Sequence, residues 1–143
     1  MSDAAACVAL TGSFNAQNAT NALWACATLH LDDPRIVGPL ARACESLTAS
    51  FNAQDATISL WACARLRFDD PAVVGPLGRA CVALAGSLDM RQALIAMWAT
   101  QVLRGPEDHE CCFATRFQEL AEDRWLARHA AALAAAAAAT RPG

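Results

Sequence analysis

The side chains able to act as acids, bases or nucleophiles share no pattern typical of a catalytic site. The three histidines, His30, His109 and His129, lie in unrelated sequence contexts, and nothing around them suggests a paired acid and base. The chain also contains no G-x-S-x-G motif, no H-E-x-x-H motif and no phosphate-binding glycine loop. We therefore expect that the protein is not an enzyme.

One group of residues resembles a set of metal ligands: Cys111 and Cys112, close to His109. Adjacent cysteines lack the C-x-x-C spacing of structural zinc sites, and no second pair of ligands follows. Five other cysteines recur at two equivalent positions of the chain, namely Cys7, Cys44 and Cys81 at one and Cys26 and Cys63 at the other. Cysteines that recur in this way behave as small buried apolar residues. We expect no metal and no cofactor, and a reducing compartment.

The elements that position every polar side chain come from an internal repeat. Residues 14–50 recur as residues 51–87, so that Phe14 aligns with Phe51 at a spacing of 37 positions, and about two-thirds of the aligned positions are identical. A fixed period of about this length is typical of helical arrays. We divide the chain into the second half of a truncated repeat (1–13), two repeats (14–50 and 51–87), a degenerate repeat (88–122) and a C-terminal alanine-rich helix and tail (123–143).

Each repeat is predicted to form two helices, which makes the fold class all-α, a right-handed α-solenoid of antiparallel helix pairs with a 37-residue repeat. First helices should begin after the N-caps Asn15, Asn52 and Asp89 and end near residues 29, 66 and 103. Second helices should begin at the two Asp-Asp-Pro segments, 32–34 and 69–71. The Gly-Pro pairs at 38–39 and 75–76 predict a kink or a short turn before the second helix proper.

The ends of the chain are predicted to be helical as well. Residues 1–12 should form a helix of the truncated repeat, and the degenerate repeat should have its second helix at about 109–122. A separate last helix is expected from about 123 to 139, with Trp125, Leu126, His129 and Leu133 packed back on the array.

Composition limits the possible locations and partners. The chain is 55% hydrophobic and 17% charged, its net charge is −3, and all its basic residues are arginine. No apolar run approaches the roughly 20 residues needed to span a bilayer, so we expect no membrane association. The N-terminus has the character of neither a signal peptide nor a transit peptide. The repeats are nearly neutral, whereas nucleic-acid binding usually shows as a basic face.

The pattern F-x-x-Q-x-x-x-N-x-L-W-A-x-A-x-L at residues 14–29 resembles the octotricopeptide repeat and the related arrays of proteins with FAST-kinase-like or RAP domains. The second copy has Ile58 where the pattern has asparagine, the third has Arg91 in place of the glutamine, and the proline-rich P-P-P-E-W segment is absent. The resemblance covers roughly residues 6–104. It implies paired-helix repeats that bind RNA and act in RNA processing, stability or translation in mitochondria or chloroplasts.

On this basis the expected function is binding of single-stranded RNA along the surface of the first helices. Polar positions that differ between repeats could contact base edges, as in other helical RNA-binding repeats. Arginines on the same surface could bind phosphates or stack on bases. The candidate RNA-binding residues are Asn18, Asp55, Gln92, Asn21, Arg65, Arg67, Arg91 and Arg104. An ordinary solvent-exposed helix face explains the polar residues at each of these repeat positions equally well.

Two further sets of residues on the first helices are expected to be structural. Trp24, Trp61 and Trp98 should belong to the core, and Gln17 and Gln54 should bond between helices or to a turn. An alternative function is a scaffold that binds proteins, since helical arrays commonly present a concave face to peptides and near-neutral charge suits this role. Self-association through exposed repeat ends is a further possibility.

Overall fold

The computed structural model describes residues 13–103 and 109–139, and these residues are almost entirely helical. The main helices are α2 (Ala16–Leu29), α3 (Pro34–Ser46), α4 (Ala53–Leu66), α5 (Pro71–Ala83), α6 (Met90–Leu103) and α7 (His109–Ala139). Two short 3-10 helices, η2 (Thr48–Ser50) and η3 (Ala85–Ser87), precede α4 and α6. The helix predicted for residues 1–12, the connection around Arg104 and the last four residues lie outside the described part.

The first helices begin where the capping residues predict. The side-chain oxygens of Asn15, Asn52 and Asp89 accept hydrogen bonds of 2.7–2.8 Å from the backbone amide three residues later. Each bond satisfies one of the amides that the first turn leaves without a backbone partner. The predicted bounds of α2, α4 and α6 are therefore confirmed to within a residue.

The second helices also begin as expected, at an aspartate followed by proline. Asp33 and Asp70 accept from the backbone amides of Arg35 and Ala72 at 2.9 and 3.0 Å, with proline in the first turn. Of the two alternatives expected at the Gly-Pro pairs, the short turn is wrong, because Pro39 and Pro76 lie inside continuous helices. The kink stays a prediction. A proline close to a helix start removes only a bond near that end, and the flanking apolar positions hold the helix on the core.

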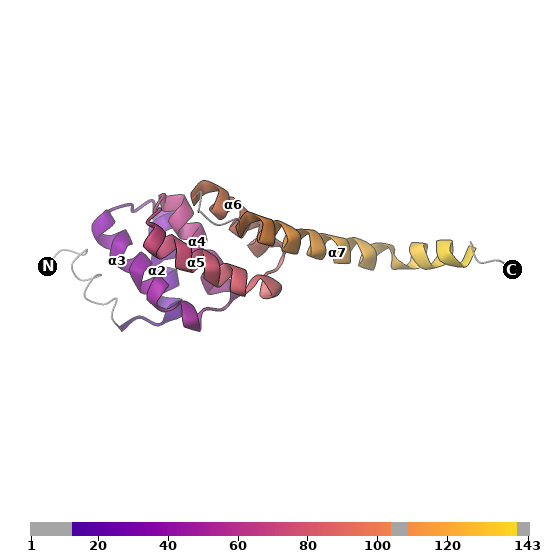
Figure 1. The fold of residues 1–143 in the computed structure, drawn as a ribbon, viewed down its shortest axis with the longest axis horizontal. Helices are drawn as coiled ribbons and strands as arrows, with labels where there is room; N and C mark the ends of the chain where they lie inside the picture. The colour runs from indigo at the N-terminus through magenta and orange to yellow at the C-terminus, as the bar shows by residue number, and fades with distance from the viewer. Residues whose placement is uncertain (1–12, 104–108, 140–143) are drawn as a thin grey trace.

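The helices form two layers (Figure 1). In one layer α2 packs on α4 and α4 packs on α6. In the other, α3 packs on α5, and α5 contacts α7. Each second helix also packs on the first helix before it. The central helix α4 is consequently covered on several sides, which explains why eight of its residues are buried.

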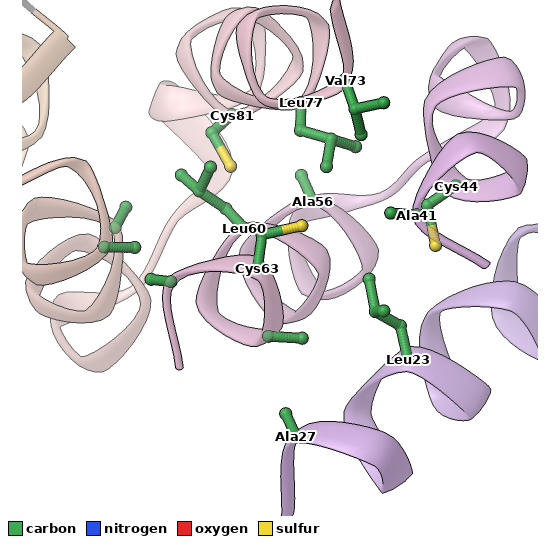
Figure 2. Packing of buried hydrophobic residues seen from close by; sticks show 14 of the residues in the cluster. Leu23, Ala27, Ala41, Cys44, Ala56, Leu60, Cys63, Val73, Leu77 and Cys81 are labelled. Atoms are coloured by element: carbon green, nitrogen blue, oxygen red, sulfur yellow. The ribbon is translucent and has the colours of Figure 1, made fainter. Parts of the chain in front are cut away.

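The core lies between these two layers and consists of small and branched apolar side chains. Figure 2 shows Leu60 and Cys63 of α4 between Leu23 of α2 and Leu77 of α5. Leu23, Leu60 and Leu77 are at most 2% exposed. Many of the other buried residues are alanines and cysteines, which let helix backbones approach closely.

The buried cysteines have thiols that resist ionisation. Burial raises the pKa of Cys44 to about 12, with the Asp55 carboxylate as a smaller cause, and burial alone raises the pKa of Cys81 to about 12. The pKa of Cys63 is raised as well, by burial and by the neighbouring Cys44. The folded protein therefore keeps these protons at a pH where the unfolded chain releases them.

This difference predicts that the protein loses stability in alkali. Above about pH 9 the unfolded state binds fewer protons than the folded state, so the free energy of unfolding should fall as pH rises toward about 12. The chain has no lysine and no tyrosine, so cysteines are the side chains that titrate in this window. Urea unfolding under reducing conditions at pH 8, 9, 10 and 11 checks the prediction. A midpoint that stays constant through pH 11 would contradict it.

The C-terminal region differs from the prediction of two helices. Residues 109–139 form the single helix α7, which runs away from the body toward its C-terminal end (Figure 1). Its first part is anchored by Phe113, which is fully buried, and by Arg116, whose Nε donates to the Leu88 carbonyl at 3.0 Å. Trp125, Leu126 and Leu133 are 42–51% exposed, so the expectation that they pack back on the array is wrong.

His129 is also exposed, and its only described contacts are within α7. Its ring stacks on Trp125 with centroids 4.4 Å apart, and its Nδ1 lies 2.8 Å from the Trp125 carbonyl oxygen. No helix in the described ranges is both long enough and apolar enough to cross a bilayer.

Candidate functional site

Three tryptophans lie on the outer surface of the layer formed by α2, α4 and α6, and we call Trp24, Trp61 and Trp98 the tryptophan row. Trp24 is 47% exposed, Trp98 is 42% exposed and Trp61 is half-buried. The expectation that these residues belong to the core is therefore wrong for Trp24 and Trp98. Trp61 packs partly against the core and remains partly accessible.

The position of each tryptophan on its helix explains the exposure. In α2 the buried side chains Leu23, Cys26 and Ala27 form the stripe that faces the core. Trp24 follows Leu23 by one residue, which rotates its side chain about 100° around the helix. The same offset separates Trp61 from the buried Leu60. A large ring at this angle covers the edge of the core with one side and leaves the other side to solvent.

A groove crosses this surface from α2 to α6. Its volume is about 570 Å³, and each of the three first helices contributes side chains to it. Its lining combines aromatic, branched apolar, amide and charged side chains, namely Asn21, Trp24, Gln54, Thr57, Ile58, Trp61, Asp89, Arg91, Gln92 and Ile95. The groove therefore offers flat apolar surfaces next to hydrogen-bonding groups.

Three of the predicted RNA-binding residues meet in this groove: Asn21, Arg91 and Gln92. The side chain of Gln92 already makes one hydrogen bond within the protein, because its Oε1 accepts from the backbone amide of Asp89 at 3.0 Å. Asn18 is exposed on α2 but does not line the groove. Arg104 lies outside the described residues, so its place on this surface stays a prediction.

Asp55 does not present its carboxylate to solvent, which corrects the expectation of an exposed residue. It is 8% exposed and forms a capping box with Asn52, whose backbone amide donates to Asp55 Oδ2 at 3.2 Å. The hydroxyl oxygen of Thr20 on α2 lies 3.5 Å from Asp55 Oδ1. Asp55 thus closes the first turn of α4 against α2, and this role accounts for its burial.

Replacing Asp55 with alanine should destabilise the fold by about 1–2 kcal/mol, because a cap and a contact between helices are lost together. The matched control is Asn18→Ala at the equivalent position of α2, which is exposed and should change stability by less than about 0.5 kcal/mol. Urea denaturation followed by circular dichroism measures both. Equal effects of the two substitutions would contradict the structural role of Asp55.

Arg65 and Arg67 lie near the C-terminal end of α4, and both are exposed. The Arg65 guanidinium carbon lies 5.8 Å from the centroid of the Trp61 ring, within the range of a cation–π contact. Arg67 is the C-cap of α4 and has a left-handed backbone with φ of 54°, as does His30 at the end of α2 with φ of 55°. This conformation ends the helices and turns the chain toward the second layer.

Charge on this surface is low and slightly positive. Helix α2 carries no charged residue, whereas α4 and α6 contribute Arg65 and Arg91. Asp89 is the acidic residue of the groove, and its carboxylate already accepts from the Gln92 amide at 2.8 Å. A polyanion would therefore find few phosphate contacts, and most of its binding energy would have to come from other interactions.

The groove contains residues that the sequence analysis assigned to other roles or did not single out. Trp24 and Trp61 line the groove, although the sequence predicts that they belong to the core. Gln54 lines it as well, although the prediction for Gln17 and Gln54 is a bond between helices or to a turn; both are exposed. Ile58 and Ile95 also line the groove, at the positions equivalent to Asn21. The available signal is the position of Trp24 and Trp61 one residue after the leucines of the apolar stripe, Leu23 and Leu60.

The described residues contain no group of three or more histidine, cysteine or acidic side chains that could hold a metal ion. The side chains of His109 and Cys111 lie outside the described part, so the absence of a metal site at the Cys-Cys segment stays a prediction. Protein-family models, curated proteins and solved structures give no match to this chain.

Proposed function

We propose that the protein binds single-stranded RNA along the surface of α2, α4 and α6, with the bases against the tryptophan row. The observation that carries the proposal is the exposure of tryptophans at one position of three neighbouring helices. Single-stranded nucleic acids bind to such surfaces because every base has a flat face that can stack on an indole ring.

The groove supports this proposal through its polar lining. Asn21, Gln54 and Gln92 carry amide groups, which can both donate to and accept from base edges. They differ in position between the first helices, so each helix offers a base a different environment. The proposal includes the finer architecture, a right-handed α-solenoid of antiparallel helix pairs in which each 37-residue unit contributes one first helix to the binding surface.

The resemblance to octotricopeptide repeats extends the proposal to the cellular role. It favours action in RNA processing, stability or translation in a mitochondrion or chloroplast. An alternative is a protein-binding scaffold, which the exposed Trp125, Leu126 and Leu133 of α7 favour, since exposed apolar side chains on a projecting helix are typical of contact surfaces.

Salt dependence separates RNA from protein binding. If Arg65, Arg67 and Arg91 each contact a phosphate, the slope of log affinity against log salt is about −2, and affinity for a random single-stranded RNA pool should fall about twentyfold between 50 and 200 mM salt. Fluorescence anisotropy measures this. The double substitution Arg65→Ala and Arg67→Ala should reduce the fall to about threefold.

The matched control removes the same charge from the other layer, with Arg35→Ala and Arg42→Ala on α3. Both arginines are exposed, so the substitutions should leave RNA affinity and its salt dependence unchanged. Absence of RNA binding by the folded protein at either salt concentration would contradict the proposal and favour the protein scaffold.

A further inference from the structure

The three members of the tryptophan row differ in the residue that follows four positions later on the same helix. Trp24 is followed by Thr28, Trp61 by Arg65 and Trp98 by Val102. Residues four apart are neighbours on a helix surface, so these side chains lie beside the rings. Among the three, only the ring of Trp61 has a cationic neighbour at this position.

Two contacts hold Arg65 in place over the Trp61 ring. Its guanidinium carbon is 5.8 Å from the ring centroid, and its Nη2 is 3.3 Å from Nε2 of His30. His30 belongs to the end of the preceding first helix, where its left-handed backbone caps α2. The arginine thus bridges two neighbouring first helices while it covers one face of the central tryptophan.

A base cannot stack on that face of Trp61 while the guanidinium lies over it. An exposed cation–π contact corresponds to about a two- to fivefold preference, whereas stacking of a base on an aromatic side chain corresponds to about a five- to 150-fold preference. A base can therefore displace the guanidinium, and the released arginine is a free cation beside the bound strand.

We propose that RNA binding moves Arg65 from the Trp61 ring to a phosphate of the strand, and that a base takes its place on the ring. This inference rests on the proposed RNA binding and adds to it a residue that changes its contact partner on binding. A base must compete with Arg65 only at the central tryptophan. The competition lowers the affinity of every base for the central ring by the same factor, so stacking at Trp61 should be weaker than at Trp24 and Trp98.

The substitution Arg65→Thr gives the central helix the residue that α2 has at the same position. The free protein is tested first, in a background with Trp24→Phe, Trp98→Phe and Trp125→Phe, which leaves Trp61 as the single tryptophan. Quenching of Trp61 fluorescence by acrylamide should increase when Arg65 becomes threonine. Unchanged quenching would overturn the idea that Arg65 covers the ring.

The complex is tested in the protein with all its tryptophans, with fluorescein-labelled oligo(A) and oligo(U) as probes. Arg65→Thr should lower the slope of log affinity against log salt by about 0.7, the value for one phosphate contact on a single strand. At high salt, where the phosphate contact is screened, loss of the competitor should raise the affinity for both probes about two- to fivefold and leave their ratio unchanged. Arg42→Ala on α3 is the charge control and should change neither quantity.

The outcomes distinguish this inference from the proposed function. If the protein binds both probes but Arg65→Thr leaves the salt slope and the affinity at high salt unchanged, the exchange of Arg65 is overturned and RNA binding stands. If neither probe binds the folded protein, the proposed function fails and the exchange fails with it, whatever the quenching shows.

Discussion

Replacing Trp24 or Trp98 with alanine is expected to weaken the binding of single-stranded RNA by about five- to 150-fold for each residue. The reason is that stacking of a base on an aromatic side chain contributes about 1–3 kcal/mol. The fold should tolerate either substitution, because the side chains are 47% and 42% exposed, and the loss of stability should be about 1 kcal/mol or less. Fluorescence anisotropy and urea denaturation measure the two effects separately.

The chain provides a matched control for this experiment in Trp125. This tryptophan is 51% exposed, like the two in the row, but it lies on α7, where its ring stacks on His129 of the same helix. Trp125→Ala should leave RNA affinity unchanged. If all three substitutions weakened binding equally, or if Trp24→Ala and Trp98→Ala unfolded the protein, the assignment of the row as a stacking surface would be wrong.

Replacing Leu60 with alanine is expected to lower the free energy of unfolding by about 2–5 kcal/mol. Leu60 is 2% exposed and lies on α4, the helix that the other first helices and the second layer cover. Removing its side chain loses the transfer free energy of the buried carbons and leaves a cavity that the packed helices fill only in part. Urea denaturation followed by circular dichroism gives the change.

Leu94→Ala is the control for the same change of side chain at the surface. Leu94 lies on α6 and is 53% exposed, so its replacement should alter stability by less than about 0.5 kcal/mol. A loss of stability at Leu60 no greater than at Leu94 would contradict the described core, in which α4 is central.

The helix starts could be predicted from the sequence because they depend on neighbouring residues. Asn15, Asn52 and Asp33 act on amides two or three positions away, so the local sequence contains both partners of each bond. The recurrence of these residues gave several independent indications of the same helices. The packing of α2, α4 and α6 side by side follows from equal helices that each have an apolar stripe.

The environment of individual side chains was harder to predict, because it depends on neighbours that are distant in sequence. Recurrence showed that Trp24 and Trp98 occupy one position but not whether that position faces the core or solvent. Asp55 shares one repeat position with Asn18 and Gln92, and the sequence predicts that this position is exposed. The capping box of Asp55 and the nearby Thr20 bury it instead. The spacing Asn52-x-x-Asp55 is that of a capping box, so the sequence contained a signal for this role of Asp55.

The error at the C-terminus has a different cause. The predicted break near Asp123 separates the degenerate repeat from the alanine-rich tail, whereas the helices of the two earlier repeats are separated at Asp-Asp-Pro. Residues 107–139 contain neither glycine nor proline, and alanine, the commonest residue there, has the highest helix propensity. With no residue to end it, α7 continues as one helix beyond the last contacts that anchor it.

The most direct test of RNA binding on this surface uses the four tryptophan indole resonances of the ¹⁵N-labelled protein, assigned by single Trp→Phe substitutions. On titration with a short random-sequence single-stranded RNA, the resonances of Trp24, Trp61 and Trp98 should shift while that of Trp125 stays in place. No shift in the three at the highest RNA concentration, or a shift of Trp125 alone, would contradict the account.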